Sequence, residues 1–242
     1  MELRLEWGPT GAAARAAECD VAVVVDVLTF STTVSVAADR GVEVRPYRWG
    51  AATAGDEARR HGATMAVHRR DAAPGDVSLS PETFRTAEDL SRVVLPSPNG
   101  STICAVLAEA GADVVVASLR NRRAVAAYLQ RRSGRVLLVP AGERWPDGSL
   151  RPAIEDLWGA GAVAVAVMDA DPAVEVSLEA AAGAAAYRLV EGRVAAALDA
   201  CASGQELTGW GYASDVSIAA ELDTSSAVAT LRDGWLVPQP VG

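Results

Sequence analysis

The sequence predicts an α/β protein of three layers, in which helices cover both faces of a mostly parallel or mixed sheet and the C-terminal third is helical. Short β-branched runs alternate with alanine-rich stretches, the pattern of parallel strands joined by helical crossovers. Residues 21–27 are nearly all valine, which is typical of a strand buried on both faces. No linker divides the 242 residues, so we expect one domain over residues 1–242.

The same alternation predicts the elements in order. Strands are expected where β-branched residues run together, at residues 21–27, 42–47, 64–67, 92–95, 113–117 and 135–139. Helices are expected in the alanine-rich stretches, at residues 31–39, 51–61, 102–110, 122–131, 153–168, 174–192 and 193–202. Residues 231–237 are expected as a late strand or an extended tail. Two long irregular segments, 71–81 and 141–152, are either functional loops or tolerated insertions.

The charge balance argues against nucleic acid and anionic membranes as partners. Basic residues number 22 against 31 acidic ones, a net charge of −9, whereas both partners require an excess of cations. The longest apolar stretch, residues 157–168, is shorter than the roughly 20 residues that span a bilayer. The N-terminus also lacks the apolar run of a signal peptide. We therefore expect a cytoplasmic protein without a membrane or nucleic-acid partner, and its sequence is compatible with a homodimer.

Missing residue types exclude several kinds of chemistry. Every basic residue is an arginine, so no lysine is present for a Schiff base, for pyridoxal phosphate or for a P-loop. With only two histidines, His61 and His68, the chain cannot build a three-histidine zinc site. The three cysteines are far apart and odd in number, which suits a reducing compartment better than a disulfide framework.

Three predicted strand ends carry hydroxyl or amide side chains directly before a helix. These three junctions are residues 29–33, 97–102 and 118–121. Helix N-termini present free N–H groups and partial positive charge, and ligands of open α/β sheets collect at the carboxyl ends of the strands. Together the three junctions predict a pocket for an anion, although ordinary helix capping explains any one of them alone. The candidate substrate-binding residues are Ser31, Thr32, Thr33, Asn99, Gly100, Ser101, Thr102, Ser118, Arg120 and Asn121.

Acidic residues near these junctions are candidates for catalysis and metal binding. Asp26 closes the valine strand, and Glu155 and Asp156 stand in the first turn of a predicted helix, where acids often only complement the helix dipole. Asp215, in a glycine-rich segment, is a weaker candidate. Carboxylates beside a phosphate pocket suit Mg²⁺ and not zinc. We therefore expect Asp26, Glu155 and Asp156 to lie together at the carboxyl edge of the sheet and to hold Mg²⁺.

The ordered set of these motifs resembles the 2-phosphosulfolactate phosphatase family, which is linked to coenzyme M biosynthesis. The matches keep their order over residues 20–220, although no single motif is specific. Asp26-Val27-Leu28 with Ser31-Thr32-Thr33 resembles the family's DVLRA-S/T-T-T segment, Ser80-Pro81-Glu82 its GNSPSE segment, Asn99-Gly100-Ser101 its TTNGT turn, Ser118-Leu119-Arg120-Asn121 its S-x-x-N junction, and Ala141-Gly142, Glu155-Asp156 and Ala160-Gly161 its CAG…ED…AG stretch.

The resemblance implies a Mg²⁺-dependent phosphoric monoester hydrolase whose partner is a small phosphorylated 2-hydroxy acid, similar to 2-phosphosulfolactate. It implies catalytic and metal-binding roles for Asp26, Glu155 and Asp156. The sequence departs from the family pattern at Thr29, where an arginine follows DVL, and at Pro140, where a cysteine precedes Ala-Gly. The first change removes a guanidinium from the expected anion pocket, and the second excludes a thiol nucleophile at that position.

Two alternatives accompany this interpretation. A homologue that retains the pocket without turnover would act as a small-anion-binding protein. A phosphatase of the haloacid-dehalogenase type is disfavoured, because Leu28 stands where its second aspartate would be and the chain has no lysine. The identity of the nucleophile, water or an acidic side chain, is left open by the sequence. If Arg120 or Arg144 reaches the space beside Thr29, the missing guanidinium is replaced.

Overall fold

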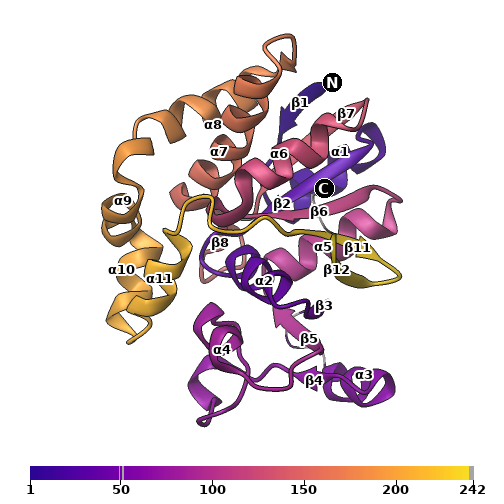
Figure 1. Ribbon diagram of the computed structural model, residues 1–242, viewed down its shortest axis with the longest axis vertical. Helices are drawn as coiled ribbons and strands as arrows, with labels where there is room; N and C mark the ends of the chain where they lie inside the picture. Colours follow the sequence, from indigo (N-terminus) through magenta and orange to yellow (C-terminus); the bar gives the residue numbers. More distant parts are fainter. Residues whose placement is uncertain (49, 51, 240–242) are drawn as a thin grey trace.

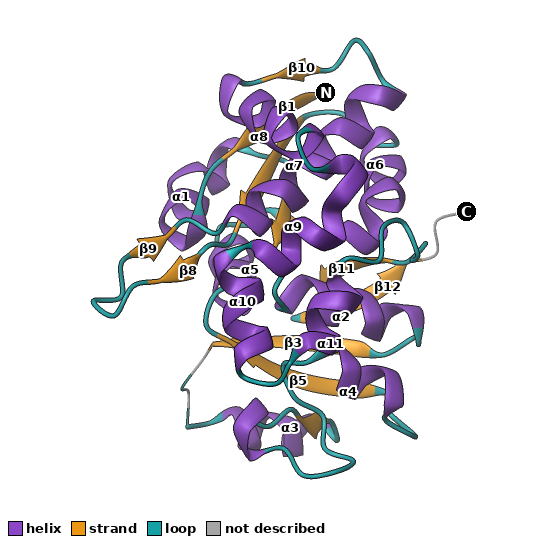
Figure 2. Cartoon of the chain, turned by 90° about the vertical axis from the view of Figure 1, so that its left-hand side faces the viewer, coloured by secondary structure: helices purple, strands orange, loops and turns teal. Residues whose placement is uncertain are grey.

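A ten-stranded sheet runs through the protein, and a computed structural model describes residues 1–48, 50 and 52–239 (Figure 1). The strand order is β10-β1-β7-β2-β6-β11-β12-β3-β5-β4. These strands are β1 (Glu2–Leu5), β2 (Val21–Val25), β3 (Glu43–Arg48), β4 (Thr64–Met65), β5 (Arg92–Ser97), β6 (Asp113–Ala117), β7 (Arg135–Pro140), β10 (Glu175–Val176), β11 (Val228–Arg232) and β12 (Trp235–Gln239). A separate antiparallel hairpin, formed by β8 (Glu143–Arg144) and β9 (Leu150–Arg151), extends from the body of the molecule (Figure 2).

Most of the helices connect successive strands along the chain. They are α1 (Gly8–Arg15), α2 (Phe30–Asp39), α3 (Ala54–His61), α4 (Pro81–Thr86), α5 (Gly100–Glu109), α6 (Arg122–Gln130), α7 (Ile154–Ala170), α8 (Leu178–Arg188), α9 (Val194–Ala200), α10 (Ala202–Gly209) and α11 (Ala213–Ala219), with 3₁₀ turns at Ala16–Glu18, Arg69–Asp71, Leu119–Asn121 and Glu191–Arg193. Figure 1 shows α9, α10 and α11 grouped beside the sheet, on the side that Figure 2 turns toward the viewer. No helix of the described part of the chain is long and apolar enough to cross a membrane.

The sheet is mixed because a C-terminal hairpin is inserted into it. Strands β10, β1, β7, β2 and β6 are parallel to one another, and so are β3, β5 and β4. The hairpin of β11 and β12 pairs antiparallel with β6 on one side and with β3 on the other. The predicted α/β class with a mostly parallel, mixed sheet is therefore confirmed.

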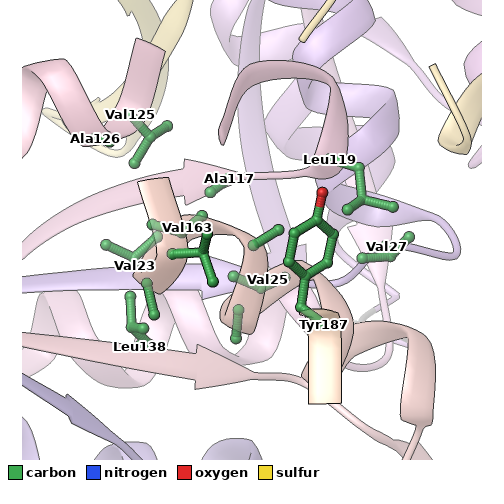
Figure 3. Close-up of a cluster of buried hydrophobic side chains, with 14 of the residues drawn as sticks. Val23, Val25, Val27, Ala117, Leu119, Val125, Ala126, Leu138, Val163 and Tyr187 are labelled. Atoms are coloured by element: carbon green, nitrogen blue, oxygen red, sulfur yellow. The ribbon is translucent and has the colours of Figure 1, made fainter. Parts of the chain in front are cut away.

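The valine run of β2 explains the three layers. Because successive side chains of a strand point to opposite faces, Val23 and Val25 pack with α6, α7 and α8, whereas Ala22 and Val24 pack with α1, α2 and α5. All five residues of the strand are buried. Figure 3 shows the first of these cores, in which Val163 and Tyr187 of the helices meet the valines of β2.

Most predicted elements are present, and the corrections have local causes. Residues 175–176 were expected to be helical but pair with β1 as the edge strand β10, and residues 231–237 form parts of two strands joined by a turn. The irregular segment 141–152 contains the β8–β9 hairpin. The first position of the predicted helix 51–61 lies outside the described residues. Strand β1 and helices α1 and α4 were not predicted, and α10 and α11 were predicted only as part of a helical C-terminal third, because their apolar runs are too short to show a period.

Candidate active site

The cavity at the predicted site has a volume of about 370 Å³ and lies where five parts of the chain meet. The β2–α2 junction, the segment before α4, the β5–α5 junction and the α10 region contribute to its wall, and β8 adds one carboxylate. The lining residues are Asp26, Leu28, Thr29, His68, Arg69, Arg70, Leu79, Ser97, Pro98, Asn99, Glu143, Ser203, Glu206, Leu207, Trp210 and Tyr212.

Asp26 holds the two neighbouring junctions together. Its Oδ1 accepts a hydrogen bond from the Phe30 N–H at 3.0 Å, and its Oδ2 accepts one from the Gly100 N–H at 3.0 Å. The N-termini of α2 and α5 therefore both point at this carboxylate, which is the expected place for negative charge. Burial nevertheless raises the pKa of Asp26 to about 6, while the two N–H groups and Arg69 act in the opposite direction.

Asp156 lies behind Asp26 and bridges two strand ends. Its Oδ1 accepts the Val27 N–H at 2.7 Å, and its Oδ2 accepts the Gly142 N–H at 2.8 Å. Burial, followed by the charges of Asp26 and Glu155, holds the pKa of Asp156 well above its usual range. The structure thus brings Asp156 to the residue next to Asp26, although 129 residues separate Val27 from Asp156 in the sequence.

Glu155 is also buried, at 2% exposure, but neither Glu155 nor Asp156 belongs to the cavity wall. Glu155 lies close enough to Asp26 and Asp156 for its charge to raise the pKa of both carboxyls, and it also lies beside Cys201. Burial and the Glu155 carboxylate raise the pKa of the Cys201 thiol to about 12. Of the three predicted acidic residues, Asp26 is thus the one that the structure places on the cavity.

Glu143 adds a second carboxylate to the cavity. Its Oε2 accepts a hydrogen bond from Asn99 Nδ2 at 3.0 Å. Burial and the nearby charge of Asp26 raise the pKa of Glu143 to about 7. Sequence reasoning missed this residue, although it directly follows the Ala141-Gly142 pair in the segment 141–152, for which a functional loop was one of two alternatives.

Arg69 supplies the positive charge that position 29 lacks. Its guanidinium donates to Thr29 Oγ1 and forms an ion pair with Asp215, with 3.2 Å between Nη2 and Oδ2. The same guanidinium lies 5.3 Å from the centre of the Tyr212 ring. The expectation that the pocket loses a guanidinium is corrected, because one arrives from a different segment. The adjacent arginines 69 and 70, directly before the irregular segment 71–81, were the signal in the sequence.

Arg120 and Arg144, which were considered for the space beside Thr29, have other partners. Arg120 is bound to Ser35, Asp39 and Glu221, and it does not line the cavity. Arg144 is also absent from the wall and contacts Asn99 Oδ1 and Pro98 O, each at 3.3 Å.

The candidate substrate-binding hydroxyls of the first two junctions form hydrogen bonds within the fold and do not line the cavity. They were expected to face an anion, but each of them that has a partner is bonded to the backbone. The bonds run from Ser31 to Val24 O, from Thr32 to Val27 O, from Ser101 to Leu95 O and from Thr102 to Pro98 O. Thr33 is buried as well. Of these two junctions, Asn99 is the candidate substrate-binding residue that the structure places on the cavity wall.

The third junction serves as a cap. Ser118 Oγ accepts the Arg120 N–H at 3.2 Å, and Asn121 Oδ1 accepts the Ser118 N–H at 2.8 Å. Asn121 also donates to Ala227 O at 3.1 Å, which ties this turn to the segment before β11. The structure therefore places Ser118, Arg120 and Asn121 in the scaffold and not on the cavity wall, because each is already paired within the fold.

The donor set can be compared with what Mg²⁺ requires. Within residues 1–48, 50 and 52–239, no three His, Cys, Asp or Glu side chains converge to enclose a metal ion. Mg²⁺, however, commonly takes only one or two carboxylates together with substrate phosphate and water. Asp26 and Glu143 meet that condition, since both lie on the cavity wall and, among the described residues, neither forms an ion pair.

The fold and the site together define an α/β protein with a cavity at strand ends that is lined by both carboxylates and arginines. A family model described as 2-phosphosulpholactate phosphatase matches residues 10–234. The chain belongs to this family, and the resemblance drawn from its motifs is confirmed. A search of the curated proteins found no match. The family is one of phosphatases, which supports a phosphoric monoester hydrolase.

Gly100 is required for the close approach of the two junctions. A Cβ at this position would lie 2.2 Å from Cδ1 of Phe30, a fully buried ring. We expect Gly100→Ala to lower the free energy of unfolding by about 1–3 kcal/mol and to lower kcat by moving the N–H that binds Asp26. Urea unfolding and steady-state kinetics measure the two effects. Gly192→Ala is the control, because a Cβ there meets nothing within 4 Å, and equal effects of both variants would contradict this account.

Glu143 makes the stability of the metal-free protein depend on pH. Its pKa is raised from 4.5 to about 7 on folding, so between these values the folded protein binds more protons than the unfolded chain. The contribution of this carboxyl to stability is therefore lost as the pH rises through that window. We expect Glu143→Gln to be more stable than wild type by about 1–3 kcal/mol at about pH 8, and not at about pH 4. Urea unfolding in the presence of a chelator tests this, and a difference that is independent of pH would contradict it.

Proposed function

We propose that this protein is a Mg²⁺-dependent phosphatase that hydrolyses a small phosphorylated 2-hydroxy acid similar to 2-phosphosulfolactate. The observation that carries the proposal is the position of Asp26, a buried carboxylate on the cavity wall toward which two helix N-termini point. Membership of the phosphatase family supports the reaction class, and the cavity chemistry supports an anionic ester.

The residues in and around the cavity have different roles in this proposal. Asp26 and Glu143 would hold Mg²⁺, which when bound neutralises charge on the phosphate and on the leaving oxygen. Asn99 fixes the Glu143 carboxylate by the hydrogen bond from Nδ2. Asp156 does not touch the cavity and instead fixes the backbone on both sides of it, through Val27 and Gly142.

Apolar side chains close the other side of the cavity. Leu207, Trp210 and Tyr212 come from α10 and the turn after it, and Leu28 and Leu79 face them from the other segments. Such a wall reduces the amount of water around the reacting group and strengthens the electrostatic interactions inside the site. The wall also offers apolar contact to the carbon skeleton of the acid.

Release of inorganic phosphate tests the proposal. A panel of phosphorylated 2-hydroxy acids, 2-phosphosulfolactate and 2-phospholactate among them, would be incubated with the protein with and without Mg²⁺. We expect release that depends on Mg²⁺ and is abolished by a chelator. Binding of the acids without any release would contradict the proposal and would support the small-anion-binding protein instead.

A further inference from the structure

Arg69 is largely buried and has an incomplete set of partners. Its side chain is 15% exposed, and its known hydrogen bond and ion pair both use Nη2. Within the described residues, Nε has no hydrogen-bond partner. A guanidinium has five N–H donors in a rigid fork. Because Nε is buried, the donors that remain for a ligand in the cavity are those of Nη1.

The surroundings of Arg69 fix its position. Asp215, at 0% exposure, pairs with Nη2 through Oδ2 and accepts a 2.5 Å hydrogen bond from Ser80 Oγ through Oδ1. On another side, Thr29 Oγ1 accepts from the guanidinium and itself donates to Leu79 O at 3.0 Å. The face of Tyr212 completes the enclosure. Two segments distant in sequence, one with Thr29 and one with Tyr212 and Asp215, thus hold this side chain in a single orientation.

Arg69 also lies close enough to Asp26 for its charge to act on the carboxylate. The positive charge of Arg69 lowers the pKa of Asp26 against the larger effect of burial. Both residues line the cavity. A phosphate that reaches Asp26 therefore comes within the field of this guanidinium. Of the basic residues on the cavity wall, Arg70 is the other arginine, and its guanidinium lies over the exposed ring of Trp210, at 5.8 Å.

We propose that Arg69 binds the anionic oxygens of the substrate and that Asp215 and Thr29 are positioning residues, which orient its guanidinium toward Asp26. The ligand class is a phosphoryl group, and this choice rests on the proposed function. A guanidinium binds two oxygens of one phosphate through parallel N–H bonds, a geometry that an ammonium cannot reproduce. The substitution of threonine at position 29 is then part of the site, because a small hydroxyl leaves room for Arg69 and accepts its hydrogen bond.

Equilibrium binding of inorganic phosphate, measured by calorimetry with Mg²⁺ present, tests the role of Arg69 without turnover. We expect Arg69→Ala to weaken binding by about 10- to 100-fold, and Arg69→Lys to recover only part of it. Arg59→Ala is the control for loss of one positive charge, since that side chain is 75% exposed and pairs with Asp56 outside the cavity lining, and it should bind as wild type does. Arg69→Gln retains a donor toward Thr29 and replaces the alanine variant if that variant does not fold.

Guanidinium rescue tests the role of Asp215. Millimolar guanidinium should restore phosphate binding to Arg69→Ala, but not to the double variant Arg69→Ala/Asp215→Asn, because Asp215 is needed to hold the added cation. In steady-state assays Asp215→Asn should raise KM more than it lowers kcat. A purely structural role of Asp215 would lower the melting temperature without this difference in rescue.

The outcomes separate this inference from the proposed function. If Arg69→Ala binds phosphate as tightly as wild type does, the inference is wrong, whether or not the protein hydrolyses esters. If binding depends on Arg69 but no ester in the panel is hydrolysed, the inference holds and the proposed phosphatase activity is wrong. Equal rescue of the single and double variants would overturn the positioning role of Asp215.

Discussion

Replacing Asp26 by asparagine is expected to lower kcat for phosphate release by at least about 10³-fold. The amide keeps the shape of the side chain, and its oxygen can still accept one of the N–H bonds from Phe30 and Gly100. It removes the negative charge that would hold the metal, so the chemistry fails while the scaffold stays. Steady-state kinetics at saturating Mg²⁺ measures the loss.

Unfolding experiments provide the control for this variant. Since Asp26→Asn relieves the cost of a buried charge and loses one hydrogen bond, we expect its free energy of unfolding to stay within about 2 kcal/mol of the wild-type value. The exposed Asp169, whose side chain is 69% exposed, offers Asp169→Asn as a matched change elsewhere. An Asp26→Asn variant that retains a tenth of the wild-type kcat would contradict the role assigned to Asp26.

Replacing Asp156 by alanine is expected to lower the free energy of unfolding by about 2–4 kcal/mol. The change leaves the N–H groups of Val27 and Gly142 without their acceptors in a buried region, and each unpaired group costs about 1–3 kcal/mol. The two segments that it joins both border the cavity, so activity should fall as a consequence of their movement. Urea unfolding at constant pH measures the stability.

Asp169→Ala is the matched control on the same helix. Its carboxylate lies 3.9 Å from Arg188 on the surface, and exposed pairs contribute little to stability. We expect a change within about 0.5 kcal/mol. If Asp156→Ala is as stable as Asp169→Ala but inactive, then Asp156 acts in the chemistry and not in the scaffold.

The strands of the central sheet could be predicted because a strand buried on both faces is a continuous run of apolar residues in the sequence. The valine run of β2 and the apolar runs of β6 and β7 contain few polar residues, so their positions matched the structure to within one or two residues. The insertion of the β11–β12 hairpin between β6 and β3 could not be predicted, since strand order depends on tertiary packing that no local period records.

The candidate site could be predicted only where a functional residue ends a strand. Asp26 was found because it follows a buried run. Arg69 and Glu143 were missed because they reach the cavity from a 3₁₀ turn and a short hairpin, whose placement follows from contacts distant in sequence. The hydroxyls of Ser31 and Thr32 were assigned to substrate because a helix cap and an anion site use the same residue types.

A crystal structure of the protein grown with Mg²⁺ and inorganic phosphate would test the central claim most directly, because it locates the anion. The account predicts phosphate in the cavity of about 370 Å³, with its oxygens on the Arg69 guanidinium and a metal ion between Asp26, Glu143 and the phosphate. Phosphate bound instead at the Ser118–Asn121 turn, with this cavity empty, would contradict it.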